Sequence, residues 1–396
     1  MADIFNKDAF ILPEGVIYLD GNSLGPMPKV VPERVQQVMT AEWAQMLIRA
    51  WNAADWMGMP ERVGDMVGRL VGAPAGSVVM GDTLSIKVFQ ALAAAVKMRP
   101  ERRVILSDTG NFPSDLYMAE GLVGLLGQGY ELRTVAPEEV AEAMDEDVAV
   151  VMLTEVDYRT GRMHDMKAMT ELAHANGSVM VWDLAHSAGA IPVALEASGC
   201  EFAVGCTYKY LNGGPGAPAF IYVRPDLAAE AQPALSGWLG HRQPFDFDLN
   251  YTPAEGIQRM RVGTPPILQM AALEAAMEVW DGVDMTDVRR ASLALQEQFI
   301  EEVERDVPQL TLASPREPES RGSQVSFRFE QGYAAMQALI DRGVIGDFRA
   351  PDIMRFGFTP LYLDPGDVSG AVAIIRDVME NELWNDDRYK TRSRVT

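Results

Sequence analysis

Short apolar runs alternate with amphipathic segments from about Trp51 to the neighbourhood of Arg224, and this alternation restricts the possible folds most. Between the runs lie helical patterns such as Met166–Ala175, which stops at Asn176-Gly177, a typical helix end. Strands that alternate with helices predict an α/β fold with a mostly parallel sheet and helices on both faces. The runs expected to form buried strands are Arg103–Ser107, Val148–Leu153, Ser178–Trp182, Phe202–Cys206 and Ala219–Val223.

The C-terminal part has a different pattern. After about Trp280 a helical segment, a strand, a second helical segment and a second strand follow one another, which predicts a smaller α+β domain. We expect an N-terminal segment over 1–50 that packs with the small domain, a large domain over 51–282 and the small domain over 283–396. The segments behind these boundaries are the helical pattern Val30–Arg49, then Val288–Arg305, Gln324–Phe329, Tyr333–Asp341 and Ile353–Phe358.

Charge and cysteine content exclude several classes of function. Lys and Arg number 34 against 56 Asp and Glu, a formal net charge of -22, which argues against nucleic acid or an anionic membrane as partner. No stretch approaches the roughly 18 apolar residues that span a bilayer, and Met1–Lys7 lacks the apolar run of a secretory signal. Cys200 and Cys206 are too few for a disulfide framework or a four-ligand zinc site. We therefore expect a cytoplasmic enzyme acting on a small molecule, with no metal site.

Two neighbouring strands end in residues that could do chemistry. Asp183 and His186 follow one expected strand, and Lys209 follows the next, beside the glycine-rich stretch Asn212–Gly216. Because the carboxyl ends of parallel strands line the ligand crevice of such sheets, these side chains should meet. A lysine that holds an aldehyde and an aspartate that keeps a ring nitrogen protonated indicate pyridoxal phosphate chemistry. Taken singly, Asp183 could be a helix cap and Lys209 a solvated surface charge. These alternatives explain the two residues together less well than a cofactor site does.

A phosphate would also need a binding site. Gly81–Ile86 precedes the alanine-rich helical run Phe89–Val96, so the amides of Leu84 and Ser85 would lie at a helix N-terminus, where an anion is favoured. An ordinary helix cap in the same turn is the alternative.

Seven motifs together resemble the kynureninases, which are fold-type-I, aminotransferase class V-like pyridoxal phosphate enzymes. The aspartate and histidine of DLAH occur in a wide group of such enzymes, whereas FPSD, YKYLN, GWLGH and the Thr-Pro-Pro segment are specific to kynureninase-like chains. The resemblance covers most of the chain. The motifs are YLDGNSLGP (18–26), NFPSDLY (111–117), DYRTGRMHD (157–165), DLAHSAGA (183–190), TYKYLNGGPG (207–216), GWLGH (237–241) and RVGTPPIL (261–268).

The resemblance implies hydrolysis of L-kynurenine to anthranilate and L-alanine in tryptophan catabolism, with 3-hydroxy-L-kynurenine as a second substrate. It also implies a homodimer whose subunits share their active sites. The implied catalytic residues are Lys209, Tyr208, Asp183 and His186. The cofactor would be bound by these four and by Leu84, Ser85, Phe112, Asp115 and Thr154, with Trp238 and Thr264 from the second subunit, and the substrate by Arg355, Asn22 and Thr264.

Two positions depart from the family pattern. Thr264 stands where the family has Asn or Thr, and Gly357-Phe358 follows Arg355 where family members often have Ala-Pro. The arginine fits its implied role, because a planar guanidinium can pair with both oxygens of a carboxylate.

Cysteine desulfurases and selenocysteine lyases share the aspartate, histidine and lysine pattern and form the main alternative. They need a thiolate acceptor, and here the thiols flank the strand before Lys209, where we expect them to be buried. An aminotransferase and a non-enzymatic scaffold that merely binds the cofactor are the remaining alternatives.

Overall fold

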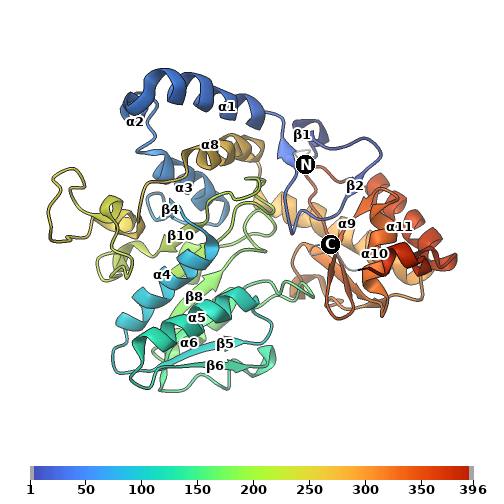
Figure 1. Cartoon of the computed structure of the whole chain (residues 1–396). Helices are drawn as coiled ribbons and strands as arrows, with labels where there is room; N and C mark the ends of the chain where they lie inside the picture. The colour runs from blue at the N-terminus through green and yellow to red at the C-terminus, as the bar shows by residue number, and fades with distance from the viewer. Residues whose placement is uncertain (1–3, 392–396) are drawn as a thin grey trace.

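The computed structural model describes residues 4–391, which form a large sheet domain beside a smaller domain (Figure 1). The large sheet has seven strands in the order β4-β10-β9-β8-β7-β5-β6. Neighbours from β9 to β6 are parallel, whereas β10 is antiparallel to both β4 and β9. The bounds are β4 Val78–Met80, β5 Val104–Asp108, β6 Glu131–Val135, β7 Val148–Thr154, β8 Val179–Asp183, β9 Phe202–Gly205 and β10 Phe220–Val223.

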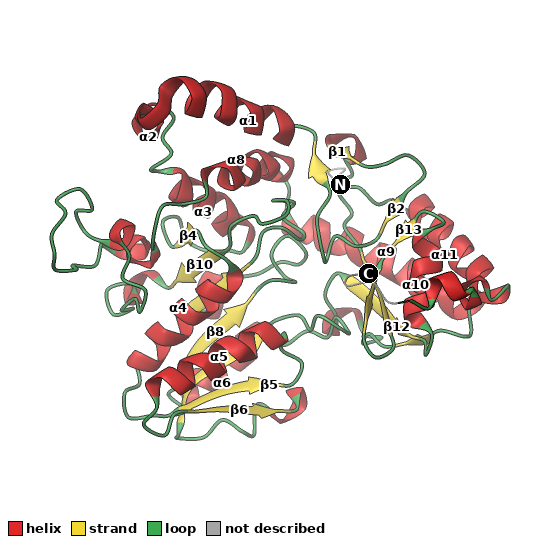
Figure 2. Cartoon of the chain, viewed as in Figure 1, coloured by secondary structure: helices red, strands yellow, loops and turns green. Residues whose placement is uncertain are grey.

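Successive residues of the central strands enter two different cores. Val179 and Val181 pack with α4 on one face, while Met180 and Trp182 join the core on the other face. Since both faces are covered, every residue of β7 and β8 is buried. Figure 2 shows helices on either side of the yellow strands. The large-domain helices are α3 Met59–Leu70, α4 Leu84–Lys97, α5 Pro113–Leu126, α6 Met166–Ala175, α7 Leu195–Ser198 and α8 Ile267–Ala276.

The small domain is built on an antiparallel sheet in the order β11-β12-β15-β14. Helix α9 contacts β12, and α10 contacts β15, so the sheet and its helices share one core. The bounds are α9 Met285–Asp306, β11 Thr311–Leu312, β12 Gln324–Arg328, α10 Gly332–Ile340, β13 Val344–Ile345, β14 Asp347–Arg349, β15 Ile353–Gly357 and α11 Pro365–Glu380.

The N-terminal segment contacts both domains. Strand β2 (Ile17–Tyr18) pairs with β13, whereas α1 (Val31–Gln37) packs on α8 at the top of Figure 1. Strands β1 (Phe10–Ile11) and β3 (Met27–Pro28) pair with each other. The division of the chain at residues 50 and 282 therefore stays a prediction.

The expected fold class is confirmed, with differences in detail. All five expected large-domain strands are present within two residues of their predicted ends, and α6 has the predicted bounds. The single helix expected over Val30–Arg49 is wrong in detail: α1 passes into a π-helix over Val38–Met46, a short 3-10 turn over Leu47–Arg49 and then α2 (Ala50–Ala53). Leu47, with φ 54°, interrupts the regular helix. Within residues 4–391 no helix is long and apolar enough to cross a membrane.

Candidate active site

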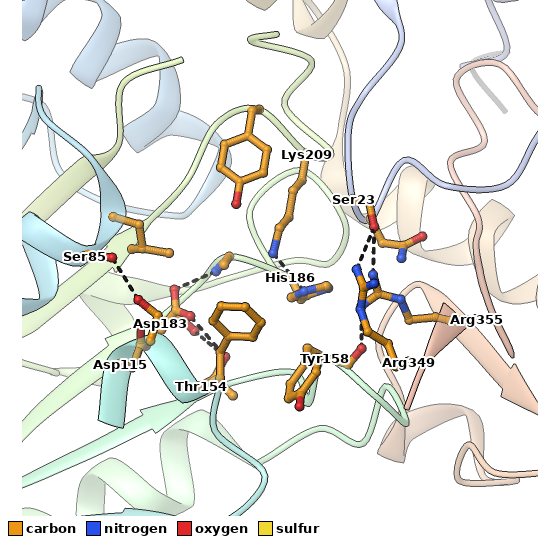
Figure 3. Close-up of a pocket in the computed structure, with 16 residues that line it drawn as sticks. Ser23, Ser85, Asp115, Thr154, Tyr158, Asp183, His186, Lys209, Arg349 and Arg355 are labelled. Carbon is orange, nitrogen blue, oxygen red and sulfur yellow. Dashed lines mark hydrogen bonds between the residues drawn. The ribbon is translucent and has the colours of Figure 1, made fainter. Parts of the chain in front are cut away.

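A pocket opens at the carboxyl ends of β7, β8 and β9, where the large domain meets the N-terminal turn and the small-domain sheet. In Figure 3, Asp183, Asp115 and Thr154 lie on one side of this pocket, Ser23, Arg349 and Arg355 on the other, and Lys209 and His186 between them. The lining residues are Asn22, Ser23, Leu84, Ser85, Phe112, Ser114, Asp115, Thr154, Tyr158, Asp183, Ala185, His186, Tyr208, Lys209, Arg349 and Arg355.

Asp183 is the last residue of β8 and lies at the floor of the pocket. The parallel register places it opposite Thr154, whose hydroxyl donates to Oδ2 at 3.4 Å, and the Ala185 amide donates to Oδ1 at 2.9 Å. Burial raises the pKa of Asp183 to about 6. Burial, together with the nearby Asp183, also raises the pKa of Asp115 well above its ordinary value. Ionisation of both carboxyl groups at once is therefore unfavourable, and a cation beside them would favour it.

Lys209 follows β9 and reaches across the pocket to His186, with 2.9 Å between Nζ and Nε2. Burial lowers the pKa of Lys209, and burial together with Lys209 lowers the pKa of His186 well below its ordinary range. Bonding to an aldehyde requires the uncharged form of a lysine amine, and a lowered pKa makes that nucleophilic form more available.

The N-terminal turn holds the backbone of this lysine. The Gly25 amide donates to the Tyr208 carbonyl at 2.8 Å, and the Asn212 side chain donates to the Pro26 carbonyl at 3.1 Å. A Cβ atom on Gly25 would lie 2.2 Å from the Lys209 carbonyl oxygen, so this close approach requires glycine.

Helix α4 starts at the pocket, as the sequence predicts. Its N-cap residue, Thr83, makes no side-chain capping bond, and both Leu84 and Ser85 line the pocket. The first amides of a helix have no partner within it, so this helix end is suited to an anion such as a phosphate.

Phe112 precedes α5 and lies at the mouth of the pocket. Its amide donates to Asn111 Oδ1 at 2.7 Å, and Asn111 in turn donates to Ser107 Oγ at 3.0 Å. Its ring meets that of Tyr158 edge-on, with centroids 5.1 Å apart. These contacts fix an aromatic face that a planar ligand could stack on.

Arg355 lies on β15 and is buried opposite Lys209. It forms a two-point ion pair with Asp347, with 2.8 Å from Nε to Oδ1, and Nη2 also donates to Ser23 Oγ at 2.8 Å. Burial alone would lower the pKa of Arg355, but the Asp347 carboxylate raises it above its ordinary value. The guanidinium is therefore fixed and charged.

The Gly357 departure from the family pattern has a structural reason. A Cβ atom on Gly357 would lie 2.0 Å from Asn22 Oδ1, so glycine makes room for the Asn22 side chain. Asn22 is fully buried in the pocket lining, and neither of its amide atoms has a hydrogen-bond partner. Such a group is costly to bury unless a ligand satisfies it.

The pocket brings together all the predicted site residues except Trp238 and Thr264, which are exposed outside it. Their expected place in a second subunit stays a prediction. Five lining residues were missed by the sequence analysis. Four of them, Ser23, Ser114, Tyr158 and Ala185, lie inside the family motifs, which could therefore have indicated them. No local signal marks the fifth, Arg349.

Comparison with known proteins shows the relationship. A family model described as the kynureninase C-terminal domain matches residues 288–375. A kynureninase of Pseudomonas fluorescens is 51% identical, covering 98% of this chain and 95% of that protein. The chain belongs to the kynureninase family. A second kynureninase, from Burkholderia pseudomallei, is 49% identical over the same shares of the two chains.

The kynureninase resemblance seen in the motifs is thereby confirmed, and solved structures confirm the fold. A cysteine desulfurase from Thermococcus onnurineus superposes with a TM-score of 0.80 at 18% identity, covering 95% of this chain and 97% of that chain. At this identity the likeness concerns the fold, and the kynureninase relatives carry the more specific relationship.

Proposed function

We propose that this chain is a pyridoxal phosphate-dependent hydrolase that cleaves L-kynurenine to anthranilate and L-alanine. One observation carries the proposal. In a chain of the kynureninase family, a single pocket holds a half-buried lysine, a strand-end aspartate and, facing them, a fixed arginine. We extend the activity to 3-hydroxy-L-kynurenine, and we assign both reactions to tryptophan catabolism.

The residues of the pocket fit pyridoxal phosphate. The buried Lys209 amine suits its aldehyde, the Asp183 carboxylate suits a protonated ring nitrogen, and the open N-terminus of α4 suits its phosphate. A cationic ring nitrogen would also offset the burial that raises the pKa of Asp183 to about 6. We assign cofactor binding to Lys209, Asp183, His186, Tyr208, Leu84, Ser85, Phe112, Asp115 and Thr154, completed by Trp238 and Thr264 of a second copy of the chain.

When bound, pyridoxal phosphate supplies an electron sink that stabilises negative charge on the amino-acid carbons next to the amine. We assign removal of the α-proton to Lys209, whose pKa is lowered by burial and which is therefore available as a base. Arg355 binds the substrate carboxylate and so fixes the α-carbon near this base. His186 keeps the Lys209 amine oriented through the 2.9 Å hydrogen bond.

Water must add to the aryl ketone before the carbon–carbon bond breaks, and this step needs proton transfers. We assign them to Tyr208, which lines the pocket next to Lys209. Burial raises the pKa of Tyr208, so the phenol carries its proton at neutral pH and can give it to the β-carbon after the carbon–carbon bond breaks. The proton that the hydrate loses as it becomes the anthranilate carboxylate then restores the phenol.

Sulfur transfer is not supported by the thiols. Cys200 and Cys206 are both buried, and burial raises their pKa values to about 12 and about 11. A persulfide acceptor needs an accessible thiolate, which neither residue offers.

We also propose a homodimer with shared active sites and a cytoplasmic location. The exposure of Trp238 and Thr264 and of the nearby Phe245, Phe247 and Leu249 supports a covering subunit. Two unpaired thiols fit a reducing compartment, and the net charge of -22 disfavours nucleic acid or an anionic membrane as partner.

Steady-state kinetics with the holoenzyme on L-kynurenine and 3-hydroxy-L-kynurenine test the proposal. Release of the corresponding anthranilate together with alanine is expected. Sulfide release from cysteine, or amino exchange with a 2-oxo acid, in the absence of anthranilate release would replace it with one of the other activities of this fold.

A further inference from the structure

Arg355 forms an ion pair with Asp347, and the pair as a whole offers a substrate no net charge. Asp347 lies opposite Arg355 in the β14–β15 register and occupies the Nε and Nη2 side of the guanidinium. Both side chains are 1% exposed. Burial alone would raise the pKa of Asp347, but Arg355 holds it below its ordinary value, so the pair is ionised and neutral overall.

A second carboxyl group behind this pair does not change the balance. Burial and the neighbouring Asp347 raise the pKa of Asp20 to about 8, so this group is mostly protonated at neutral pH. A substrate carboxylate entering this end of the pocket would thus meet a fixed geometry with no positive surplus from Arg355 and Asp347.

Arg349 supplies the missing charge. It stands two residues after Asp347 on β14, so both side chains project from the same face of the strand. Its Nη2 lies 2.7 Å from Asp347 Oδ2 and 3.3 Å from Ser23 Oγ, and it lines the pocket beside Arg355 (Figure 3). Two arginines and one ionised aspartate give this end of the pocket one positive charge, which one carboxylate balances.

The two arginines differ in exposure and in how firmly they are held. The Arg355 side chain is 1% exposed and held at all three of its nitrogens, whereas that of Arg349 is 33% exposed and held at Nη1 and Nη2 only. Ser23 joins them, because its hydroxyl accepts from both and donates to Asp347. Arg349 can therefore turn from Asp347 toward an incoming anion while Arg355 stays in place.

We propose that Arg349 is a substrate-binding residue that provides the positive charge for recognition of the α-carboxylate. Arg355 fixes the position of this carboxylate, and Ser23 links the two arginines. This inference rests on the proposed function, since it concerns the amino-acid end of the same substrate. A purely structural Arg349, serving only to neutralise Asp347, is the opposing explanation.

Steady-state kinetics of Arg349→Gln separate the two explanations. We expect the KM for L-kynurenine to rise by about 10- to 100-fold, as for loss of one charge-assisted hydrogen bond, with kcat changed by less than about threefold. Arg349→Lys should recover most of the affinity, because it keeps the charge. Arg328→Gln is the matched control: it removes an arginine that faces Asp352 in the same sheet but does not line the pocket, and its KM should equal that of the wild type.

Calorimetric binding to the holoenzyme supplies a readout that does not depend on turnover. The probes are 2-amino-4-phenylbutanoate, which lacks the ketone and cannot be hydrolysed, and 3-phenylpropylamine, which also lacks the carboxylate. We expect Arg349→Gln to weaken the first by the same factor as KM and to leave the second unchanged. Equal weakening of both probes, or of neither, would overturn the assignment.

Two further comparisons keep the outcomes distinct. If Arg349→Gln melts at a lower temperature than the wild type, Arg349→Met replaces it, because methionine retains the apolar stem. We expect the same change in KM and in probe binding for this variant. If the wild type releases no anthranilate, the proposed function is wrong. Calorimetry with the two probes still shows whether Arg349 favours the probe that carries a carboxylate. The assignment of Arg349 and the proposed reaction therefore fail separately.

Discussion

The Lys209 Nζ atom lies 2.9 Å from His186 Nε2 between the two sides of the pocket, and the His186 side chain is buried while that of Lys209 is half-buried. Burial lowers the pKa values of both groups, so the uncharged forms of the lysine amine and the imidazole are favoured relative to the same groups in water. This pair joins the ends of two neighbouring strands, and the lowered pKa makes the uncharged lysine amine more available for covalent chemistry.

Replacing Asp183 tests its assigned contact with the cofactor. Asp183→Asn keeps the shape but removes the charge that would face a protonated ring nitrogen. We expect kcat/KM to fall by about 100-fold or more, as for a lost charge-assisted hydrogen bond in a buried site. Thr154→Val, which removes one neutral hydrogen bond to Asp183, should cost only about tenfold or less. A larger effect for Thr154→Val than for Asp183→Asn would contradict the assignment.

Asp347 is expected to stabilise the fold as well as the site. Asp347→Ala leaves Arg355 and Arg349 buried or half-buried without their shared carboxylate. The free energy of unfolding should fall by about 3 kcal/mol, as when one partner of a buried ion pair is removed. Urea unfolding measures it. An unchanged unfolding midpoint would mean that water or another group replaces the carboxylate.

Gly357 offers a test of the Asn22 position. The added Cβ of Gly357→Ala would meet Asn22 Oδ1 at 2.0 Å, so Asn22 must move. We expect KM for L-kynurenine to rise while kcat/KM falls by about tenfold. Gly121→Ala in α5, where a Cβ meets nothing within 4 Å, is the matched control and should leave the kinetics unchanged. Identical kinetics for Gly357→Ala and wild type would show that Asn22 does not bind substrate.

The buried carboxyl group of Glu155, which lies outside the pocket, is expected to make the stability of the fold depend on pH. Burial raises its pKa from 4.5 to about 7, so the folded chain keeps a proton that the unfolded chain loses between these pH values. Stability therefore falls as the pH rises from about 4.5 to about 7. Glu155→Gln should be more stable than wild type by about 3 kcal/mol at pH 9 and equal to it at pH 4, by urea unfolding at both pH values. The exposed Glu146→Gln should show no such difference, and an equal gain at both pH values for Glu155→Gln would refute the account.

The sequence predicts those elements that have a local signal. The five buried strands are continuous apolar runs, and α6 has a clear stop at Asn176-Gly177. Strand β4 was missed because it has three residues, and β6 because it pairs only with β5 at the sheet edge and keeps polar, partly exposed residues. Periodicity alone does not reveal where a helix changes type, as it does at Leu47.

The site divides in the same way. Lys209, Asp183 and the α4 terminus could be predicted because strand ends and helix ends have known places in an α/β fold. Arg349 could not, because its relation to Arg355 depends on the pairing of β14 with β15, which no local pattern encodes. Trp238 and Thr264 lie outside the pocket of their own chain, so their role depends on a second copy.

Anthranilate fluorescence during incubation of the holoenzyme with L-kynurenine tests the central claim most directly. We expect the wild type to release anthranilate and alanine in equal amounts. Lys209→Ala should lower kcat by about 1,000-fold or more, since both the covalent anchor and the base are lost. Release of no anthranilate by the wild type, or undiminished release by Lys209→Ala, would contradict the account.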